Sequence, residues 1–378
     1  MKDVSMSKDQ LKVYHLALKV IEGDLKAKDF AVLVGLSERQ ALRRLKRIRE
    51  MDYLGAIHGN SGNIPINKID LELEEKVIHL LRTKYQGFNL THFREMLLNE
   101  EKIEIKKTTL QTFAKKHGLE KHSRRCRKKV HKPRPRMPQE GMLVQYDGSQ
   151  HRWFGGISSH LLLAIDDATG KILGAGFYEG ETTFNAMKVI GEIINEYGIP
   201  LAFYFDQAAA YGRKDRDWNC DLGRAFQALN CRLILAGSPQ AKGRVERVFR
   251  TLQDRLVSEL SLHKIKTFDM ANDYLQNHFI PIFNKQFGVE AENPTRAYLP
   301  NVFIDLDLIL CRKEQRKVLS GNIFSLDGYH YLIDEKMNHH HRLVNINTHL
   351  DGTRSFDIMG RRIAVSKLER NYRYLKAG

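Results

Sequence analysis

The sequence feature that most constrains the fold is an alternation of short apolar segments and amphipathic helical patterns between residues 142 and 259. The apolar segments have the length and composition of buried strands. They occupy residues 142–147, 160–165, 171–178, 200–206 and 231–236. Helical spacing is found at residues 182–197, 222–229 and 237–259. Three strands followed by alternating helices and strands predict a mixed α/β sheet.

The stretch from residue 237 to 259, GSPQAKGRVERVFRTLQDRLVSE, predicts the last helix of this series. Ser238-Pro239 is typical of a helix start, because proline lacks the N–H that would have no partner there. An apolar stripe follows with helical spacing, formed by Val245, Phe249, Leu252 and Leu256. Glu246 lies on the neighbouring face. It is either a functional carboxylate at the edge of a buried seam or a tolerated acid on a solvated face.

Acidic residues at the ends of predicted strands suggest a metal site. Asp147 ends the first strand and Asp206 ends the fourth, where the edge of a sheet opens into a crevice. Carboxylate oxygens are natural ligands of Mg²⁺ or Mn²⁺, and like charges held close together need a cation between them. Two such ions about 3.5–4 Å apart can serve the attacking and leaving oxygens of a phosphodiester. The sequence therefore predicts Asp147, Asp206 and Glu246 as catalytic residues and ligands of two Mg²⁺ or Mn²⁺ ions.

Other polar residues near these acids have simpler explanations. Asp166 and Asp167 precede Thr169-Gly170, and the chemistry of a tight turn accounts for both. His151 follows Asp147 in the segment DGSQHRWF. It is a candidate for contact with the substrate, and the alternative is an ordinary loop histidine.

The charge balance indicates the class of partner. The chain has 378 residues, with 61 Lys and Arg against 45 Asp and Glu and a formal net charge of +16. A basic excess of this size favours a polyanion, and nucleic acid is the usual one. We expect no membrane association, because no segment approaches the roughly 18 apolar residues of a span. Four scattered cysteines favour a reducing cytoplasm over a disulfide framework.

The N-terminal part of the chain predicts two helical DNA-binding units. Residues 1–60 contain helix, helix, a turn at Gly35 and a basic helix over 38–50, the order of a helix-turn-helix. The basic face of the last helix is expected to contact DNA through Arg39, Arg43, Arg44 and Arg47. Residues 65–120 predict a second, helix-turn-helix-like unit of weaker basic character. A bundle with no role in reading DNA is the alternative for each unit.

Two further segments flank the α/β region. Residues 121–138 carry nine Lys or Arg, three prolines and no acidic residue. They predict a basic linker that follows DNA phosphates or, alternatively, a solvated spacer. The linker cations assigned to DNA are Arg124, Arg125, Lys128 and Lys129. Short strand-like segments with Asp-Gly turns predict a small, SH3-like β-barrel over residues 315–370.

The motifs of the α/β region carry more information together than singly. They are YDGSQHRWF, IDDATGKILGAGF, FYFD and SPQAKGRVERVFRTLQDRL. In combination they resemble the integrase-type catalytic core of bacterial insertion-sequence DDE transposases. The resemblance implies a ribonuclease-H-like core over residues 139–290, the fold shared with retroviral integrases. The chain is then multidomain, with all-α units before this core and the β-barrel after it.

The resemblance also assigns residues. The family's D, D and E fall on the three acids named above. Lys242 and Arg250 fall where the family's basic helix meets the transposon end, and Arg244 is assigned to the same DNA-binding surface.

A function follows from the same resemblance. The expected enzyme binds the terminal repeats of an insertion sequence and nicks the ends in a Mg²⁺-dependent reaction. It then joins the freed 3′-OH directly to double-stranded target DNA, without a covalent protein–DNA intermediate. A dimer or larger homo-oligomer is expected to bring two ends together. Two alternatives stay open: a catalytically silent DNA-binding regulator and a metal-dependent nuclease of the same fold.

Overall fold

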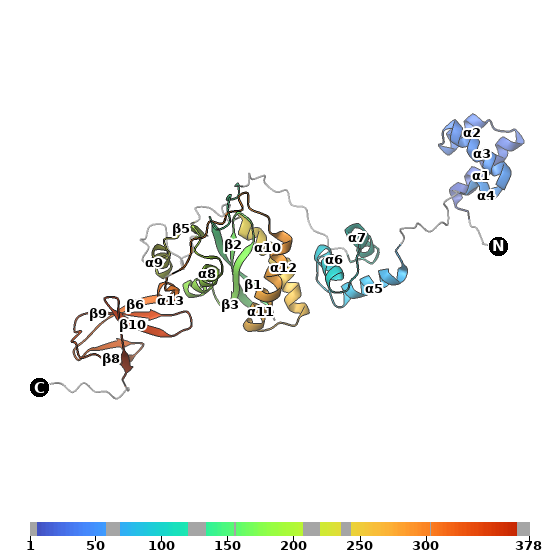
Figure 1. Ribbon diagram of the computed structural model, residues 1–378. Coiled ribbons are helices and arrows are strands. Elements are labelled where there is room, and N and C mark those ends of the chain that lie inside the picture. The colour runs from blue at the N-terminus through green and yellow to red at the C-terminus, as the bar shows by residue number, and fades with distance from the viewer. Residues whose placement is uncertain are drawn as a thin grey trace. The chain divides into compact units, whose positions relative to one another are not determined.

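The computed structural model describes residues 6–57, 69–119, 134–154, 156–206, 220–235, 243–302 and 304–368 (Figure 1). The chain forms two compact units, residues 1–75 and 76–378. None of the helices in the described ranges is long and apolar enough to span a membrane.

The N-terminal unit is helical, as the sequence predicts. Its described helices are α1 Lys8–Glu22, α2 Ala27–Val34, α3 Glu38–Met51 and the short α4 Tyr53–Ala56. Gly35 ends α2 with a left-handed φ of 70°. Ser37 then caps α3 by accepting the backbone N–H of Gln40, whose side chain binds back to the Ser37 N–H. Phe30 and Leu45 are buried between the helices.

Apolar residues with helical spacing in this unit do not all pack on its core. Leu11 and Ile21 of α1 are exposed, as is Leu42 of α3. Ala17 of α1 is fully buried instead, with Val13 packed against the same core. The two stripes have the same helical period, so periodicity alone cannot select the stripe that packs.

The next group of elements is helical, as the sequence predicts. The helices are α5 Leu71–Arg82, α6 Leu90–Asn99 and α7 Lys107–Lys116. Val77, Phe93 and Leu110 are buried, one from each helix. Asn89 caps α6 by accepting the backbone N–H of His92.

The central part of the chain contains a mixed sheet, which confirms the predicted α/β class. In the described residues its strands are β1 Val144–Phe154, β2 Ile157–Asp166, β3 Ile172–Tyr178, β4 Ala202–Phe205 and β5 Arg232–Leu235. Their spatial order is β3-β2-β1-β4-β5. β2 runs antiparallel to β1 and β3, whereas β4 runs parallel to β1 and β5.

Helices cover both faces of this sheet (Figure 1). α8 Thr183–Tyr197 and α9 Asp221–Ala228 pack on one face, where Ile190 and Phe226 share a core with Val144. The other face is covered by α10 Gly243–Leu262, α11 Phe268–Tyr274, the π-helix η2 Leu275–Phe279 and α12 Ile280–Phe287.

The apolar stripe predicted for the last helix of the sheet region is confirmed. Val245, Phe249, Leu252 and Leu256 of α10 are all buried in the core on that face. The predicted helix start at Ser238-Pro239 lies outside the described residues.

The predicted end of the first strand is wrong, because β1 continues past Asp147 to Phe154. Its later part pairs with β2 in an antiparallel arrangement, with Gly148 opposite Leu162 and His151 opposite Ser159. The polar residues after Asp147 resemble a loop in sequence. They extend as a strand because β2 supplies backbone partners, and a sheet edge open to solvent tolerates polar side chains.

The C-terminal region consists of short strands, as predicted, but in the described residues they form two antiparallel sheets and do not close into one barrel. After the short helix α13 Leu306–Ile309 come β6 Arg312–Lys317, β7 Ile323–Leu326, β8 Tyr329–Ile333, β9 Leu343–Thr348, β10 Arg354–Ile358, β11 Arg361–Ile363 and β12 Val365–Lys367. They form one sheet of order β11-β10-β9-β6 and another of order β12-β8-β7. Phe324 and Val344, one from each sheet, share a single core.

Candidate functional site

The pairing of β1 with β4 sets the two predicted aspartates side by side. Val144 pairs with Phe203 and Gln145 with Tyr204 in parallel register. The same offset, continued by two residues, sets Asp147 opposite Asp206. The rings of Tyr146 and Phe205, at the intermediate position, stack with centroids 4.6 Å apart and support the continued register. Neighbouring strands lie about 4.8 Å apart, so the two carboxylates project from adjacent backbones.

Alternation along β1 assigns these acids to one face of the sheet. Val144 and Tyr146 lie in the core beneath α8 and α9. Successive side chains of a strand point to opposite faces, so Gln145, Asp147 and Ser149 share the face covered by α10. The Ser149 hydroxyl oxygen accepts a hydrogen bond from Nε2 of Gln253 on α10 at 3.2 Å, which agrees with this assignment.

A second contact fixes the beginning of α10 near the same strand. Oδ1 of Asp167 accepts one hydrogen bond from Gln145 Nε2 at 2.5 Å and another from Arg244 Nη1 at 2.6 Å. The helix from Arg244 to Gln253 is about 13.5 Å long, and the strand from Gln145 to Ser149 is about 13 Å long. These matching lengths show that the first part of α10 runs alongside the segment of β1 that contains Asp147.

Glu246 lies within this span of α10. It is exposed, whereas its neighbour Val245 is buried. Gln253, seven residues later, lies on the same face of the helix. Glu246 therefore occupies the open side of the helix, at the end of the sheet where Asp147 and Asp206 occur.

The donor set fits a hard divalent cation, although the described side chains do not form a complete metal cluster. Asp147 and Asp206 are half-buried like charges on adjacent strands, an arrangement that a cation stabilises. Within the described ranges, no group of three or more His, Cys, Asp or Glu side chains is arranged to hold a metal ion. Residues 207–219 and 236–242 lie outside those ranges. The three-carboxylate ligand set stays a prediction.

A further carboxylate lies beside β1 that sequence analysis missed. A Cβ atom built on Gly148 would lie 2.5 Å from both Cδ and Oε2 of Glu181. Glu181 directly precedes Thr182, which caps α8. The end of the Glu181 side chain therefore lies against the Gly148 backbone, on the face of β1 opposite to the Asp147 side chain. A glycine inside a strand is the sequence signal for such a close approach.

The two aspartates at the turn after β2 have different hydrogen-bond partners. The Asp166 carboxylate accepts the backbone N–H of Gly141 at 3.0 Å, and the N–H and hydroxyl of Thr169 at 2.7 and 2.8 Å. Burial raises the pKa of this carboxyl above its usual value. The predicted turn role fits Asp166. Asp167 does more, because its buried carboxylate binds groups from other parts of the chain.

His151 packs against an aromatic residue in β1. It is half-buried, and its ring lies edge-on to Trp153 with centroids 5.3 Å apart. Trp153 is fully buried and donates its ring N–H to the Ser149 carbonyl at 3.1 Å. The role of His151 in contacting substrate stays a prediction.

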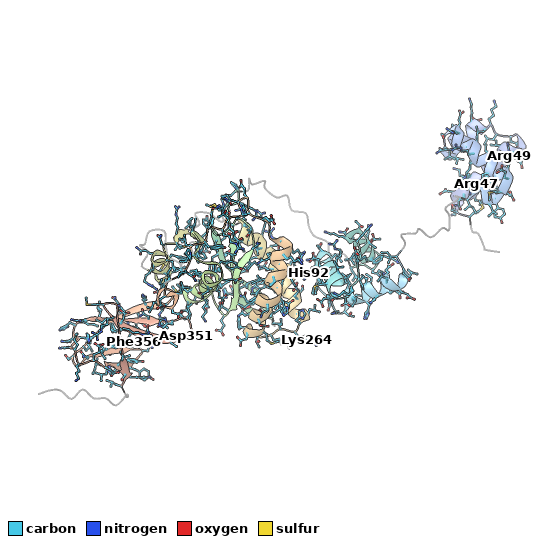
Figure 2. The ribbon with its side chains drawn as sticks, in the orientation of Figure 1. Arg47, Arg49, His92, Lys264, Asp351 and Phe356 are labelled. Atoms are coloured by element: carbon cyan, nitrogen blue, oxygen red, sulfur yellow. The ribbon has the colours of Figure 1, made fainter. Side chains whose placement is uncertain are left out.

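The arginines predicted to bind DNA on α3 differ in what they contact. Arg39 and Arg43 are exposed. Arg44 and Arg47 are half-buried and donate to the carbonyls of Ala56 and Ile57, each at 2.6 Å. Figure 2 shows Arg47 on this helix. Two of the four arginines predicted to bind DNA therefore donate hydrogen bonds to the end of α4.

The residues predicted to bind DNA outside α3 also differ in exposure and in whether the structure describes them. Arg250 of α10 is exposed, whereas the Arg244 side chain is 16% exposed and paired with Asp167. The others lie outside the described residues: Arg124, Arg125, Lys128, Lys129 and Lys242.

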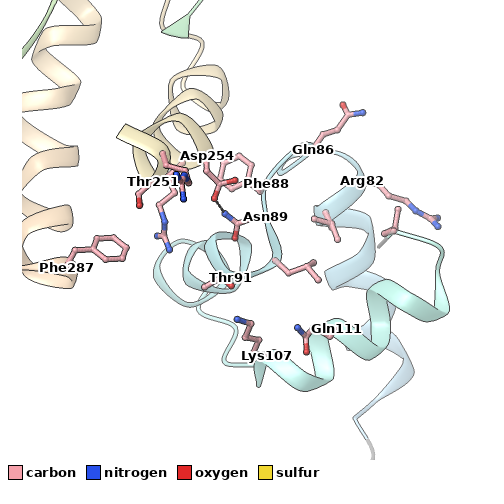
Figure 3. Close-up of a pocket in the computed structure, with 16 residues that line it drawn as sticks. Arg82, Gln86, Phe88, Asn89, Thr91, Lys107, Gln111, Thr251, Asp254 and Phe287 are labelled. Carbon is pink, nitrogen blue, oxygen red and sulfur yellow. Dashed lines mark hydrogen bonds between the residues drawn. The ribbon is translucent and has the colours of Figure 1, made fainter. Parts of the chain in front are cut away.

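An open cavity of about 980 Å³ lies where α10 and α12 meet α6 and α7 (Figure 3). Its walls include the cations of Lys107 and Arg250 and the ring of Phe287. Its sides are joined by polar contacts, including one of 2.8 Å between His92 Nε2 and Glu259 Oε1 on α10. The cavity begins one helical turn beyond Glu246.

Comparison with curated proteins finds two relatives along most of the chain. The sequence is 34% identical over 341 residues to a putative transposase, y4bF, of Sinorhizobium fredii, with coverage of 88% of this chain and 74% of the relative. It is 32% identical over 369 residues to the transposase for insertion sequence IS1202 of Streptococcus pneumoniae, with coverage of 87% and 79%. No protein-family model matches the sequence.

Comparison with solved structures finds matches that include two viral proteins. An intasome of simian T-cell lymphotropic virus in complex with PP2A regulatory subunit B56 gamma gives a TM-score of 0.35 at 14% identity, over 69% of this chain and 92% of that chain. The HTLV-2 integrase catalytic core domain in complex with magnesium gives 0.29 at 15% identity, over 37% and 88%. Because these scores are low, the assignment of a family rests on the two bacterial relatives.

Proposed function

Because this chain belongs to the insertion-sequence transposases, we propose that it cuts the ends of its own element and joins them to target DNA. In the first step, water attacks the end phosphodiester, the P–O3′ bond breaks and a 3′-OH is released. In the second, that 3′-OH attacks a phosphodiester of the target. One P–O bond forms as another breaks, so no external energy source is needed.

The proposed ligands are Asp147, Asp206 and Glu246, with Mg²⁺ or Mn²⁺ as the cofactor. Two bound cations would activate the attacking oxygen and stabilise the leaving oxygen. Asp147 lies in β1 and Asp206 directly follows β4, and these two strands pair two residues earlier. Placement on paired strands supports a fixed geometry for the two carboxylates. Glu246 contributes from α10, which is held on the sheet by buried residues such as Phe249. The single observation that most supports the proposal is the β1–β4 register, because its continuation by two residues would set Asp147 opposite Asp206.

DNA binding is proposed to use surfaces outside this centre. The exposed arginines of α3, Arg39 and Arg43, have the position and charge to meet phosphates or bases in a groove. Arg250 is proposed to contact the transposon end beside Glu246, because both are exposed on the same helix one turn apart. A transposase acts on two ends, so we propose a dimer or larger homo-oligomer on DNA.

The test uses a labelled duplex that carries the element's own terminal repeat, a target plasmid and Mg²⁺. We expect the native chain to nick the duplex at its end and to join it to the plasmid. Asp147→Asn, Asp206→Asn and Glu246→Gln should each reduce both products at least about 100-fold, since loss of an outer-shell partner alone typically costs roughly 10–100-fold.

The matched control is Asp269→Asn, which removes an exposed acid from α11. It should leave both products unchanged. Nicking without joining would favour a nuclease, and binding without either reaction would favour a regulator. Full activity in any of the three carboxylate variants would show that the proposed ligand set is wrong.

A further inference from the structure

Asp167 is a buried carboxylate that the proposed chemistry does not use. Its side chain is fully buried, although it lies in the turn between β2 and β3. A buried charge is costly unless it is paired and hydrogen-bonded. The groups that surround Asp167 come from separate parts of the chain, so its burial serves more than the turn.

The first connection is to the sheet and to α10. Oδ1 of Asp167 accepts from Gln145 Nε2 at 2.5 Å and from Arg244 Nη1 at 2.6 Å. Gln145 is fully buried and lies two residues before Asp147 on the same face of β1. Arg244 lies in the first turn of α10, two residues before Glu246. One carboxylate oxygen therefore joins the backbones that present two of the proposed ligands.

The second connection is to the segment that enters the core from the N-terminal side. Arg134 pairs with the same carboxylate, and the backbone N–H of Met137 donates to Asp167 Oδ2 at 2.9 Å. Arg244 Nη2 also donates to the Arg134 carbonyl at 2.5 Å. Arg136 donates to the Ala168 carbonyl at 3.0 Å. The entering segment is thus bound to the turn and to α10 together.

The placement of Arg244 requires this carboxylate. A cation in the first turn of a helix is opposed by the positive end of the helix dipole. Arg244 is also mostly buried, at 16% exposure of its side chain. Asp167 compensates both effects, so the pair holds the start of α10 at one position against β1. Catalytic groups must be held to within about 0.5 Å, and this depends on the residues that support them.

We propose that Asp167 is a positioning residue that sets where Glu246 lies relative to Asp147, by binding Arg244 and Gln145 through one oxygen. This inference rests on the proposed ligand set. It assigns no contact between Asp167 and a metal ion or DNA. Arg244, in this account, acts within the protein and not on the transposon end.

The experiment compares Asp167→Asn with Asp166→Asn in the full chain. Both residues are fully buried neighbours at the end of β2, but within the described ranges the hydrogen bonds of the Asp166 carboxylate come from Gly141 and Thr169. Mn²⁺ affinity is measured by calorimetry, and thermal melting is measured without metal. Both variants should melt at lower temperature than the native chain. Asp167→Asn should also weaken Mn²⁺ binding roughly 10-fold or more, as is typical when a supporting residue is lost.

Asp166→Asn should bind Mn²⁺ within about twofold of the native chain, because its loss affects stability alone. Equal Mn²⁺ affinity in the two variants would overturn the inference while leaving the proposed ligands intact. A native chain that binds no Mn²⁺, or a Glu246→Gln variant that binds it normally, would instead overturn the proposed function. If Asp167→Asn does not fold, Arg244→Lys tests the same contact from the helix. Normal Mn²⁺ affinity in that variant would also overturn the inference.

Discussion

The basic helices α3 and α10 look alike in sequence but use their arginines differently. On α3, Arg39 and Arg43 are exposed, and the helix begins at a local cap made by Ser37. On α10, Arg244 is bound to a carboxylate 77 residues away in the chain. One helix is stabilised at its start by its own neighbours, and the other by a distant buried acid.

The difference shows that counting cations does not identify a DNA-binding face. Arg255 of α10 pairs with Glu95 of α6 and lies over the ring of Phe287, 4.9 Å from its centroid. Arg44 of α3 likewise donates a hydrogen bond within the protein, to the Ala56 carbonyl. The arginines left for a polyanion are those that are both exposed and not needed by the fold.

The largest effect is expected for Arg244→Ala. It should lower the stability of the core by about 2 kcal/mol, because it leaves a buried carboxylate with one fewer partner. This is below the roughly 3–5 kcal/mol of a fully broken buried pair, since Arg134 still binds Asp167. The measurement is the urea unfolding of the core, followed by tryptophan fluorescence, to which the buried Trp153 contributes.

Arg250→Ala on the same helix is the control. As an exposed residue it should change stability by less than about 0.5 kcal/mol. Equal stability of the two variants would remove the distinction between Arg244 and the exposed arginines of α10.

An intermediate effect is expected on DNA binding from the exposed face of α3. The double change Arg39→Ala with Arg43→Ala should weaken binding to the terminal repeat and reduce the salt slope, log affinity against log salt, by about two. Thermal stability should be unaffected. Affinity is measured by fluorescence anisotropy at several salt concentrations.

The matched change is Arg44→Ala with Arg47→Ala. Because these side chains bind the carbonyls of Ala56 and Ile57, it should lower the melting temperature of the helical unit. An unchanged salt slope in the Arg39 and Arg43 variant would exclude this face of α3 from DNA binding.

The smallest effect is expected at the cap of α3. Ser37→Ala should destabilise the N-terminal unit by about 1 kcal/mol, because the Gln40 backbone N–H loses its acceptor. Ser37→Asp keeps an acceptor and should restore most of that stability. Thermal melting of both variants gives the comparison, and equal melting of Ser37→Ala and the native chain would show that the cap does not stabilise α3.

The sequence predicts local features of this molecule well. The turn at Gly35 and the stripe through Phe249 depend on residues close together in the chain, and both are confirmed. The mixed sheet could be predicted because each apolar strand has its own sequence pattern, and the structure confirms it.

Features that depend on distant partners could not be predicted in the same way. β1 extends past Asp147 only because β2 pairs with it, and β6, with the sequence RKEQRK, is a strand only because β9 pairs with it. Asp167 looks like any turn residue until Arg244 and Gln145 are brought to it. The three candidate ligands were selected by position and resemblance, and their common site stays a prediction.

The most direct test of that site is anomalous scattering from Mn²⁺ in crystals of the chain bound to a duplex with its terminal repeat. We predict Mn²⁺ peaks at the carboxyl end of β4, with ligand oxygens from Asp147, Asp206 and Glu246. Peaks at another position, or a coordination shell that excludes Glu246, would contradict the account.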